Sequence, residues 1–387
     1  MLWLFLASVG LLALSHAEAS AQVNAEVADV LHLQEASYHL TRIQQLIADS
    51  QGGAWAIDSQ IEGVVRFSES GEMVVFGRMG SGPGEFQQPW RMSLVRDTLW
   101  VVDIGLDRIS GLDPRTGQSL ATIGGGSLWR GLPEAGRQSM APLEVTEGGV
   151  LVAIEEPESA TIVLVLLDRD EPGRRRDLLR LEQSDADLHV EVPGHSNPIR
   201  IPNPFSNSDL LALDNYGRYV AKVRQRPSFE VEVVELAEEP EHNMIPWALE
   251  RREVTDEERA AWLATEELSR TFARRRFFPS EDAAREAIED ALVTGLVPMV
   301  RRMTQGVFER TTFIDGEGAL WFEGWSVGEA PPRWHRLSPE GGELKFTLED
   351  GELLLDIAGR FLWKQRFDSM DVPHLTRVEL APSGVLP

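Results

Sequence analysis

An all-β fold built from a repeated unit of four short strands is predicted by three features of the sequence. Four stretches share one pattern, an apolar strand, an Asp, a turn with Gly and a second apolar or aromatic strand: Leu46–Asp58, Leu211–Val223, Thr312–Gly324 and Leu353–Gln365. A second hairpin follows the first, as in Gly63–Gly77, Arg108–Gly124 and Arg333–Leu348. The resulting units of about 40–45 residues have the size of propeller blades. Six can be placed, at roughly 41–86, 87–133, 138–182, 205–237, 308–348 and 349–381.

These units predict a six-bladed β-propeller. A sandwich or an open solenoid also has regular short strands, but neither usually has a four-strand unit with a recurring aromatic residue. In the hairpins, Asp49, Asp214, Asp315 and Asp356 share one register, and an aromatic side chain follows each of them, namely Trp55, Tyr219, Trp321 and Trp363. An Asp at the start of a turn accepts backbone N–H groups, and Gly adopts the left-handed conformations that the turn needs.

Two segments complete the predicted architecture. Residues Ala28–Leu33 read as a strand that joins the last blade and closes the ring. A helical insertion over about 240–305 separates blades four and five, because Thr255 and Glu258 form a capping box and Ser280 caps a second helix. The insertion either packs against the flank of the propeller or serves as a lid or partner surface. We expect one propeller domain over 22–387.

The amino terminus has the features of a secretory signal. Leu2–Leu14 is an apolar run too short to span a bilayer, and Ala19-Ser20-Ala21 forms a cleavage site, which predicts a signal peptide over residues 1–21. The mature protein is then secreted or periplasmic, without stable membrane insertion. An uncleaved anchor is the alternative, because a basic n-region is missing.

Composition excludes several functions. The chain has no Cys, so thiol catalysis, Cys-based zinc sites and iron–sulfur clusters are excluded. Its 62 Asp and Glu against 37 Lys and Arg give a net charge of -25, which disfavours a nucleic-acid partner. No cofactor is predicted, although calcium or another divalent metal is compatible with this charge. The expected partner is a peptide, a glycan or a small-molecule ligand.

One stretch carries a family resemblance. Gly80–Phe86, Pro89, Trp100–Asp103, Arg108-Ile109 and Asp113–Gly117 together resemble an NHL-type propeller repeat. The whole mature chain is similar to exported bacterial six-bladed propeller proteins with NHL-like repeats. That resemblance implies ligand-binding or protein-interaction modules, with a few lyases and hydrolases among the relatives. It also implies that the connections between blades, and the loops between second and third strands, gather on one face around an axial channel.

Candidate ligand-binding residues follow from that arrangement: Asp58, Arg78, Trp90, Asp103, Glu155, His195 and Trp325. Each has a structural alternative. Asp103 is a ligand or forms an ion pair with Arg108, and His195 is a general base, a metal ligand or a histidine without a function. The pair Glu155-Glu156 binds calcium, acts as acid and base, or lies in a plain loop. The indole rings stack on sugars and peptides, or pack between blades.

The Gly-rich stretch Phe76–Pro89 looks at first like a phosphate-binding loop. A helix would have to follow it directly, and Pro89 with the strand-like Met92–Val95 indicates a connector between blades instead. No G-x-S-x-G or H-E-x-x-H motif is present. Two functions remain open, an exported binding or scaffolding propeller and a metal-dependent lyase or hydrolase that uses His195 with acids at the channel mouth. Convergence of three His, Asp or Glu side chains would favour the enzyme.

Overall fold

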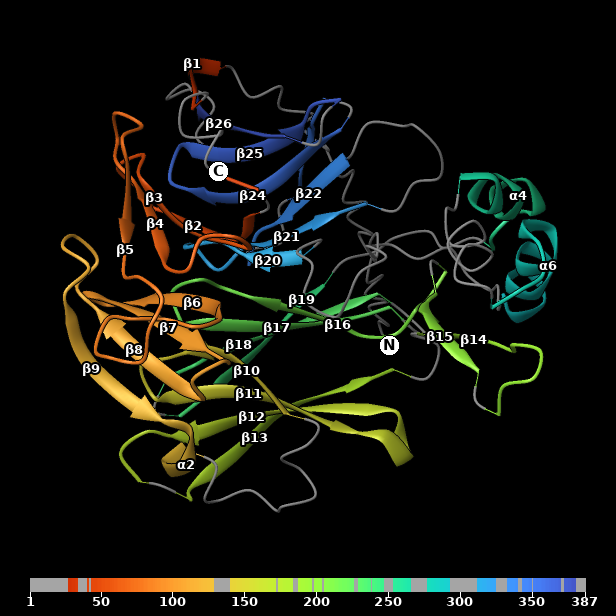
Figure 1. Cartoon of the computed structure of the whole chain (residues 1–387), viewed down its shortest axis with the longest axis horizontal. Coiled ribbons are helices and arrows are strands. Elements are labelled where there is room, and N and C mark those ends of the chain that lie inside the picture. The colour runs from red at the N-terminus through yellow and green to blue at the C-terminus, as the bar shows by residue number, and fades with distance from the viewer. Residues whose placement is uncertain are drawn as a thin grey trace, which may run out of the picture.

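The computed structural model describes residues 27–33, 40–41, 43–128, 140–171, 173–183, 187–196, 198–203, 205–225, 229–237, 239–246, 253–265, 277–292, 312–324, 333–339, 343–349, 351–369 and 372–380. These residues form six four-stranded antiparallel sheets, which follow one another in chain order around a ring (Figure 1). The first strands of neighbouring sheets touch, since β24 contacts β2, β2 contacts β6, β6 contacts β10, and β16 contacts β20. The fold is therefore a six-bladed β-propeller, as predicted.

The blades have these bounds. Blade 1 is β2 (Ile43–Ala48), β3 (Ala54–Asp58), β4 (Val64–Phe67) and β5 (Met73–Phe76); blade 2 is β6 (Pro89–Val95), β7 (Thr98–Asp103), β8 (Arg108–Leu112) and β9 (Ser119–Gly124). Blade 3 is β10 (Met140–Val145), β11 (Gly149–Glu156), β12 (Thr161–Asp168) and β13 (Arg175–Glu182); blade 4 is β16 (Leu210–Leu213), β17 (Tyr219–Arg224), β18 (Glu230–Glu235) and β19 (Glu241–Pro246). Blade 5 is β20 (Thr312–Ile314), β21 (Leu320–Glu323), β22 (Arg333–Leu337) and β23 (Glu343–Thr347). Blade 6 is β24 (Glu352–Ala358), β25 (Phe361–Phe367), β26 (Pro373–Leu380) and β1 (Val27–His32).

The ring is closed by the amino-terminal strand. β1 pairs antiparallel with β26, with Val30 opposite Val378 and His32 opposite Thr376, and the two lie side by side at the top of Figure 1. The expected closing strand is thus confirmed. The last blade combines three strands from the end of the chain with one from its beginning, so the two ends of the propeller are held in one sheet.

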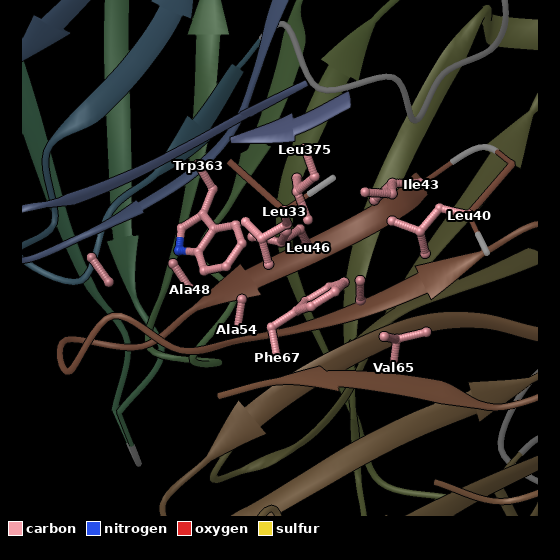
Figure 2. Close-up of a cluster of buried hydrophobic side chains, with 12 residues drawn as sticks. Leu33, Leu40, Ile43, Leu46, Ala48, Ala54, Val65, Phe67, Trp363 and Leu375 are labelled. Carbon is pink, nitrogen blue, oxygen red and sulfur yellow. The ribbon is translucent and has the colours of Figure 1, made fainter. Parts of the chain in front are cut away.

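Six hydrophobic cores lie between neighbouring blades, one at each junction of the ring. The core between blades 6 and 1 shows how they are built (Figure 2): the ring of Trp363 packs on that of Phe67 at 5.8 Å, with Leu46 and Leu375 beside them. The recurring aromatic residues of the repeat fill these junctions, and Trp321 and Trp363 have at most 1% of their surface exposed. Burial of such aromatic side chains at every junction between blades stabilises the propeller as a whole.

The predicted Asp register holds for three of the four hairpins. Asp49, Asp214 and Asp315 each stand at the turn after the first strand and accept a hydrogen bond from a backbone amide in it. The prediction is wrong for Asp356, which lies inside β24 opposite Trp363. In blade 6 the chain turns later, at Gly359.

Two insertions flank blade 4. The hairpin β14 (Asp187–Val190) and β15 (Ile199–Pro202) precedes it, and the helices α4 (Asp256–Thr265) and α6 (Glu281–Ala291) follow it. The capping box of Thr255 and Glu258 and the cap at Ser280 are present as predicted. The stretch expected to begin the insertion at about 240 contains β19, the outer strand of blade 4. Two further short helices are α2 (Gly125–Leu128) and the 3-10 helix η2 (Pro157–Ser159). The predicted signal peptide lies outside the described residues.

Candidate functional site

The two ends of the propeller axis receive different parts of the chain. Because every blade is an antiparallel meander, the turns between first and second strands open at one end. We call that end the plug face, since residues 214–218 lie there. Connections between blades, and loops between second and third strands, open at the other end. We call it the insert face, because both insertions leave the ring there.

One turn of blade 4 fills the axis at the plug face. Asn215 is buried, and its side-chain oxygen accepts a hydrogen bond from Gln45 of blade 1 at 3.1 Å. Its side-chain nitrogen donates to Asp356 of blade 6 at 2.8 Å. Its backbone carbonyl accepts from the amide of Leu94 in blade 2 at 2.8 Å. A single residue that meets three other blades must stand at the centre of the ring.

The same turn also reaches the remaining two blades. The amide of Gly217 donates to Glu144 of blade 3 at 3.2 Å, and the guanidinium of Arg218 donates to the carbonyl of Gly316 in blade 5 at 2.5 Å. We call residues 214–218 the axial plug. They hydrogen-bond to all five other blades, so they close this end of the axis and join the blades to one another.

Burial shifts two pKa values in the axial plug. Desolvation raises the pKa of Asp214 to about 7, although hydrogen bonds from the turn and the charge of Arg218 act in the opposite direction. Burial, and after it the charges of Asp356 and Asp214, raises the pKa of the Tyr216 hydroxyl above its ordinary range. That hydroxyl donates to the carbonyl of Ala48 at 2.8 Å. The axial plug therefore holds a carboxyl group that titrates near neutral pH in a dry environment.

At the insert face, the hairpin and the helices share a seventh hydrophobic core. Leu188 and Val190 from β14 pack with Ala284 and Ile288 from α6, and Leu263 from α4 joins them. In Figure 1 these elements stand together to the right of the six sheets. The two insertions are thus one structural unit, made from chain segments on both sides of blade 4, and not two independent loops.

The carboxylates of two predicted site residues accept hydrogen bonds from backbone amides. Asp103 is fully buried and accepts hydrogen bonds from three of them, those of Gln87, Gln88 and Leu106. Asp58, at the equivalent end of β3, accepts from the amide of Thr41 at 2.9 Å and from that of Gln60 at 3.0 Å. Each carboxylate fixes the loop on the insert face to the connection that enters its blade.

Arg108 does not form the expected pair with Asp103. Its guanidinium donates to the carbonyl of Ser81 at 2.9 Å and to that of Glu85 at 2.5 Å, and so clamps the Gly-rich loop. Within that loop the Glu85 carboxylate accepts the amide of Gly82 at 2.8 Å and pairs with Arg78 at 2.7 Å. The Gly82 hydrogen bond and the pairing with Arg78 hold the pKa of Glu85 below its usual range.

The geometry of the Gly-rich loop is that of a connection between blades 1 and 2. The loop links β5 to β6 with no helix after it, and its own carboxylate lies where a phosphate would have to bind. The phosphate-binding alternative, which the sequence already disfavoured, therefore has no support in the structure.

The remaining candidates lie at separate places. The Arg78 side chain is 80% exposed, and Trp90 is half-buried at the start of β6, at the insert-face end of a first strand. Glu155 is exposed on β11. His195 is exposed and packs edge-on against Phe277 at 6.1 Å, which links the hairpin to the helical segment. Trp325 lies outside the described residues.

Sequence reasoning missed the axial plug. Its one signal is Tyr216, a large aromatic residue at the turn position where blade 1 has Gln51. In the part of the chain that the structure describes, no three His, Asp or Glu side chains come close enough to hold a metal ion. None of the described helices is long and apolar enough to cross a membrane.

Comparisons with known proteins find only distant similarities. No family model matches the chain, and no curated protein matches it. Among solved structures, a gluconolactonase from Xanthomonas campestris is similar, with a TM-score of 0.42, 12% identity, and 92% of both chains covered. A virginiamycin B lyase from Staphylococcus aureus has a TM-score of 0.35 and 11% identity over 91% of this chain and 99% of the other. A calcium-binding regucalcin from Agrobacterium tumefaciens has a TM-score of 0.36 and 12% identity over 88% and 92%. These scores are low, so the architecture rests on the strand pairing, and the comparisons assign no activity.

Proposed function

We propose that this protein is an exported binding or scaffolding propeller that recognises a peptide, a glycan or a small ligand at the axial mouth of the insert face. The observation that carries the proposal is the unequal construction of the two ends of the axis. The plug face is filled by residues 214–218, whose polar groups are used to join the blades. The insert face carries the added hairpin and helices, which extend it beyond what the six blades need.

Two side chains on the insert face suit recognition. The indole ring of Trp90 is half-buried, so it offers an apolar plane on which a sugar or a hydrophobic side chain can stack. The guanidinium of Arg78 is exposed and suits a carboxylate or a hydroxyl group. The buried carboxylates of Asp58 and Asp103 serve this site by holding its loops in place.

The NHL-like repeat of blade 2, export from a bacterial cell and the acidic surface fit the same proposal. A surface with a net charge of -25 stays soluble and repels nucleic acids, whereas calcium or a cationic ligand would be attracted to it. The alternative is a metal-dependent lyase or hydrolase at the channel mouth. It would need a set of metal-binding side chains there, and the described residues supply no observation that favours it.

Two matched arginines test the proposal. Arg78 lies on the insert face and Arg96 on the plug face, both side chains are at least 75% exposed, and each pairs with one Glu, at 2.7 and 2.9 Å. Exposed ion pairs contribute little to folding, so both Ala variants should fold. The mature protein is screened on a glycan array and a peptide display library, and the affinity for each hit is then measured by calorimetry.

The expected result is that Arg78→Ala and Trp90→Ala bind roughly tenfold or more weakly, as for loss of a charged hydrogen bond or a stacked ring. Arg96→Ala should bind like the unmodified protein. Equal losses for both arginines, or a loss only for Arg96→Ala, would place the ligand elsewhere. Chemical conversion of a bound glycan or peptide by the metal-loaded protein would favour the alternative, a metal-dependent lyase or hydrolase.

A further inference from the structure

Asp214 is a buried carboxyl group at the centre of the ring with an incomplete set of partners. None of its side chain is exposed. One carboxylate oxygen, Oδ1, accepts the amide of Arg218 at 2.9 Å, and the amides of Tyr219 and Gly217 also favour the charged form. The other oxygen, Oδ2, has no hydrogen-bond donor among the described residues, and the Nε of Arg218 lies 3.6 Å away from it. A charged carboxylate in this position therefore keeps one buried oxygen without a contact that replaces water.

The equivalent residue of blade 5 shows what a complete set of partners looks like. Asp315 occupies the same turn position, and its Oδ2 accepts the indole N–H of Trp321 at 2.8 Å and the Nε of Arg336 at 3.0 Å. Its Oδ1 accepts two backbone amides, as expected for this turn. The difference between Asp214 and Asp315 is therefore local to the axial plug and is not a property of the repeat.

The charges around Asp214 are mostly of its own sign. From its own turn it is faced by Tyr216 and by Arg218, the one cation that acts on it among the described residues, and that guanidinium is 44% exposed. From the other blades, four carboxylates act on the same turn: Asp49 of blade 1, Glu144 and Glu147 of blade 3, and Asp356 of blade 6. Arg96 of blade 2 is paired with Glu147, and the contact from blade 5 is the neutral carbonyl of Gly316. Desolvation by burial raises the pKa of Asp214 to about 7.

We propose that Asp214 makes the axial plug a pH-sensitive latch, which holds the six blades together while its carboxyl group is neutral and loosens when that group becomes charged. A neutral carboxyl group remains buried at little cost, and all contacts of residues 214–218 to the other blades are kept. A charged carboxylate is better solvated if the turn moves out of the axis. That movement breaks the hydrogen bonds to Gln45, Leu94, Glu144, Gly316 and Asp356.

The sign follows from linkage. The pKa of Asp214 in the folded state lies above the ordinary value of 3.8, so protons favour the closed latch. The stabilisation is complete below about 3.8 and is lost progressively as the pH rises to about 7. Because each pKa unit corresponds to a tenfold change in the equilibrium constant, closing weakens roughly 100-fold between pH 5 and pH 8.

Hydrogen exchange measured by mass spectrometry tests this proposal on the full mature chain. Exchange of peptides that cover residues 210–220 is followed from pH 5 to pH 8 and corrected for the intrinsic dependence on pH. In the unmodified protein we expect protection of these peptides to fall between pH 5 and about 7 and to change little above that. In Asp214→Asn, which cannot ionise, protection should be independent of pH. The same fall in Asp214→Asn as in the unmodified protein would overturn the proposal.

Two further variants keep the test decisive. Arg218→Ala removes the cation that lowers the pKa of Asp214, so the pH at which protection stops falling should move higher. An unchanged or lower value would contradict the proposal even if Asp214→Asn failed to fold. The control is Asp315→Asn, which changes the equivalent turn of blade 5. This substitution should lower the melting temperature and leave the pH dependence of exchange in residues 210–220 unchanged. Loss of that pH dependence in Asp315→Asn would show that damage to any blade turn abolishes it, which would contradict a specific role of Asp214.

Discussion

Replacing Asn215 by Ala should destabilise the whole propeller, although the residue lies in a five-residue turn. The side chain is buried, accepts a hydrogen bond from Gln45 and donates one to Asp356, which belong to blades 1 and 6. Ala makes neither contact. We expect the free energy of unfolding to fall, with no change in secondary structure below the transition.

The size of the effect follows from what each partner keeps. Asp356 still accepts the amide of Ala48 at 2.9 Å, and Gln45 still donates to the carbonyl of Met92 at 2.7 Å, so neither group loses all its partners. A hydrogen bond to a charged group contributes about 1.5–3 kcal/mol and a neutral one about 0.5–1.5 kcal/mol. The expected loss for Asn215→Ala is therefore about 2–4 kcal/mol, a large part of a typical stability of about 5–15 kcal/mol.

Urea unfolding followed by tryptophan fluorescence measures this loss. The matched control is Asn243→Ala, which removes an exposed Asn from β19 and should change the free energy by less than about 0.5 kcal/mol. A double-mutant cycle between Asn215→Ala and Gln45→Ala should give a coupling energy of about 0.5–1.5 kcal/mol. A loss below about 1 kcal/mol for Asn215→Ala, or additivity with Gln45→Ala, would refute the view that this turn joins the blades.

Three further substitutions test other parts of the fold. Gly77→Ala should lower the melting temperature, because Gly77 has φ of +85° and an added Cβ would lie 2.6 Å from the ring of Phe86. An unchanged melting temperature would contradict the view that this connector between blades needs Gly at position 77. Ser280→Ala removes the N-cap of α6 and should cost about 1 kcal/mol in urea unfolding, unless that helix depends only on packing. Trp321→Phe keeps an aromatic ring but loses the hydrogen bond to Asp315, so the free energy of unfolding should fall by about 1.5–3 kcal/mol. An unchanged free energy would show that the buried carboxylate of Asp315 does not need the indole N–H.

Much of the fold could be predicted because the information is local and repeated. Each blade is a meander of strands with near neighbours in sequence, so the apolar runs and the Asp–Gly turns of one unit predict its pairing. Ring closure could be predicted as well, since the last unit, 349–381, has room for only three strands and residues 28–33 supply a fourth. The structure pairs that segment with β26.

The parts that could not be predicted depend on contacts distant in sequence or on surfaces without a pattern. β19 (Glu241–Pro246) is an outer strand whose residues 241–244 are exposed, so its sequence does not alternate, and the sequence predicts the start of the insertion there. β15 (Ile199–Pro202) lies outside the predicted units, between 138–182 and 205–237. Its hairpin is stabilised by a core that includes α6, about eighty residues further on.

The candidate site residues show why exposed function and buried structure are hard to separate in a sequence. Asp58 and Asp103 end second strands on the insert face, which is where carboxylates that bind a ligand would also stand. Loops at strand ends leave backbone amides without partners, and a carboxylate satisfies several of them at once. The structure uses both residues in this way.

The same reasoning separates two kinds of buried carboxylate in the propeller. A carboxylate such as Asp103, whose oxygens meet three backbone amides, holds its surroundings in place. Asp214 is as deeply buried, but one of its oxygens has no donor among the described residues, so we expect its surroundings to respond to its charge. Burial alone therefore does not mark a responsive group on this fold. The count of donors around each buried oxygen does, and it directs experiments on the axis to Asp214, while ligand binding is best sought at the exposed side chains of the insert face.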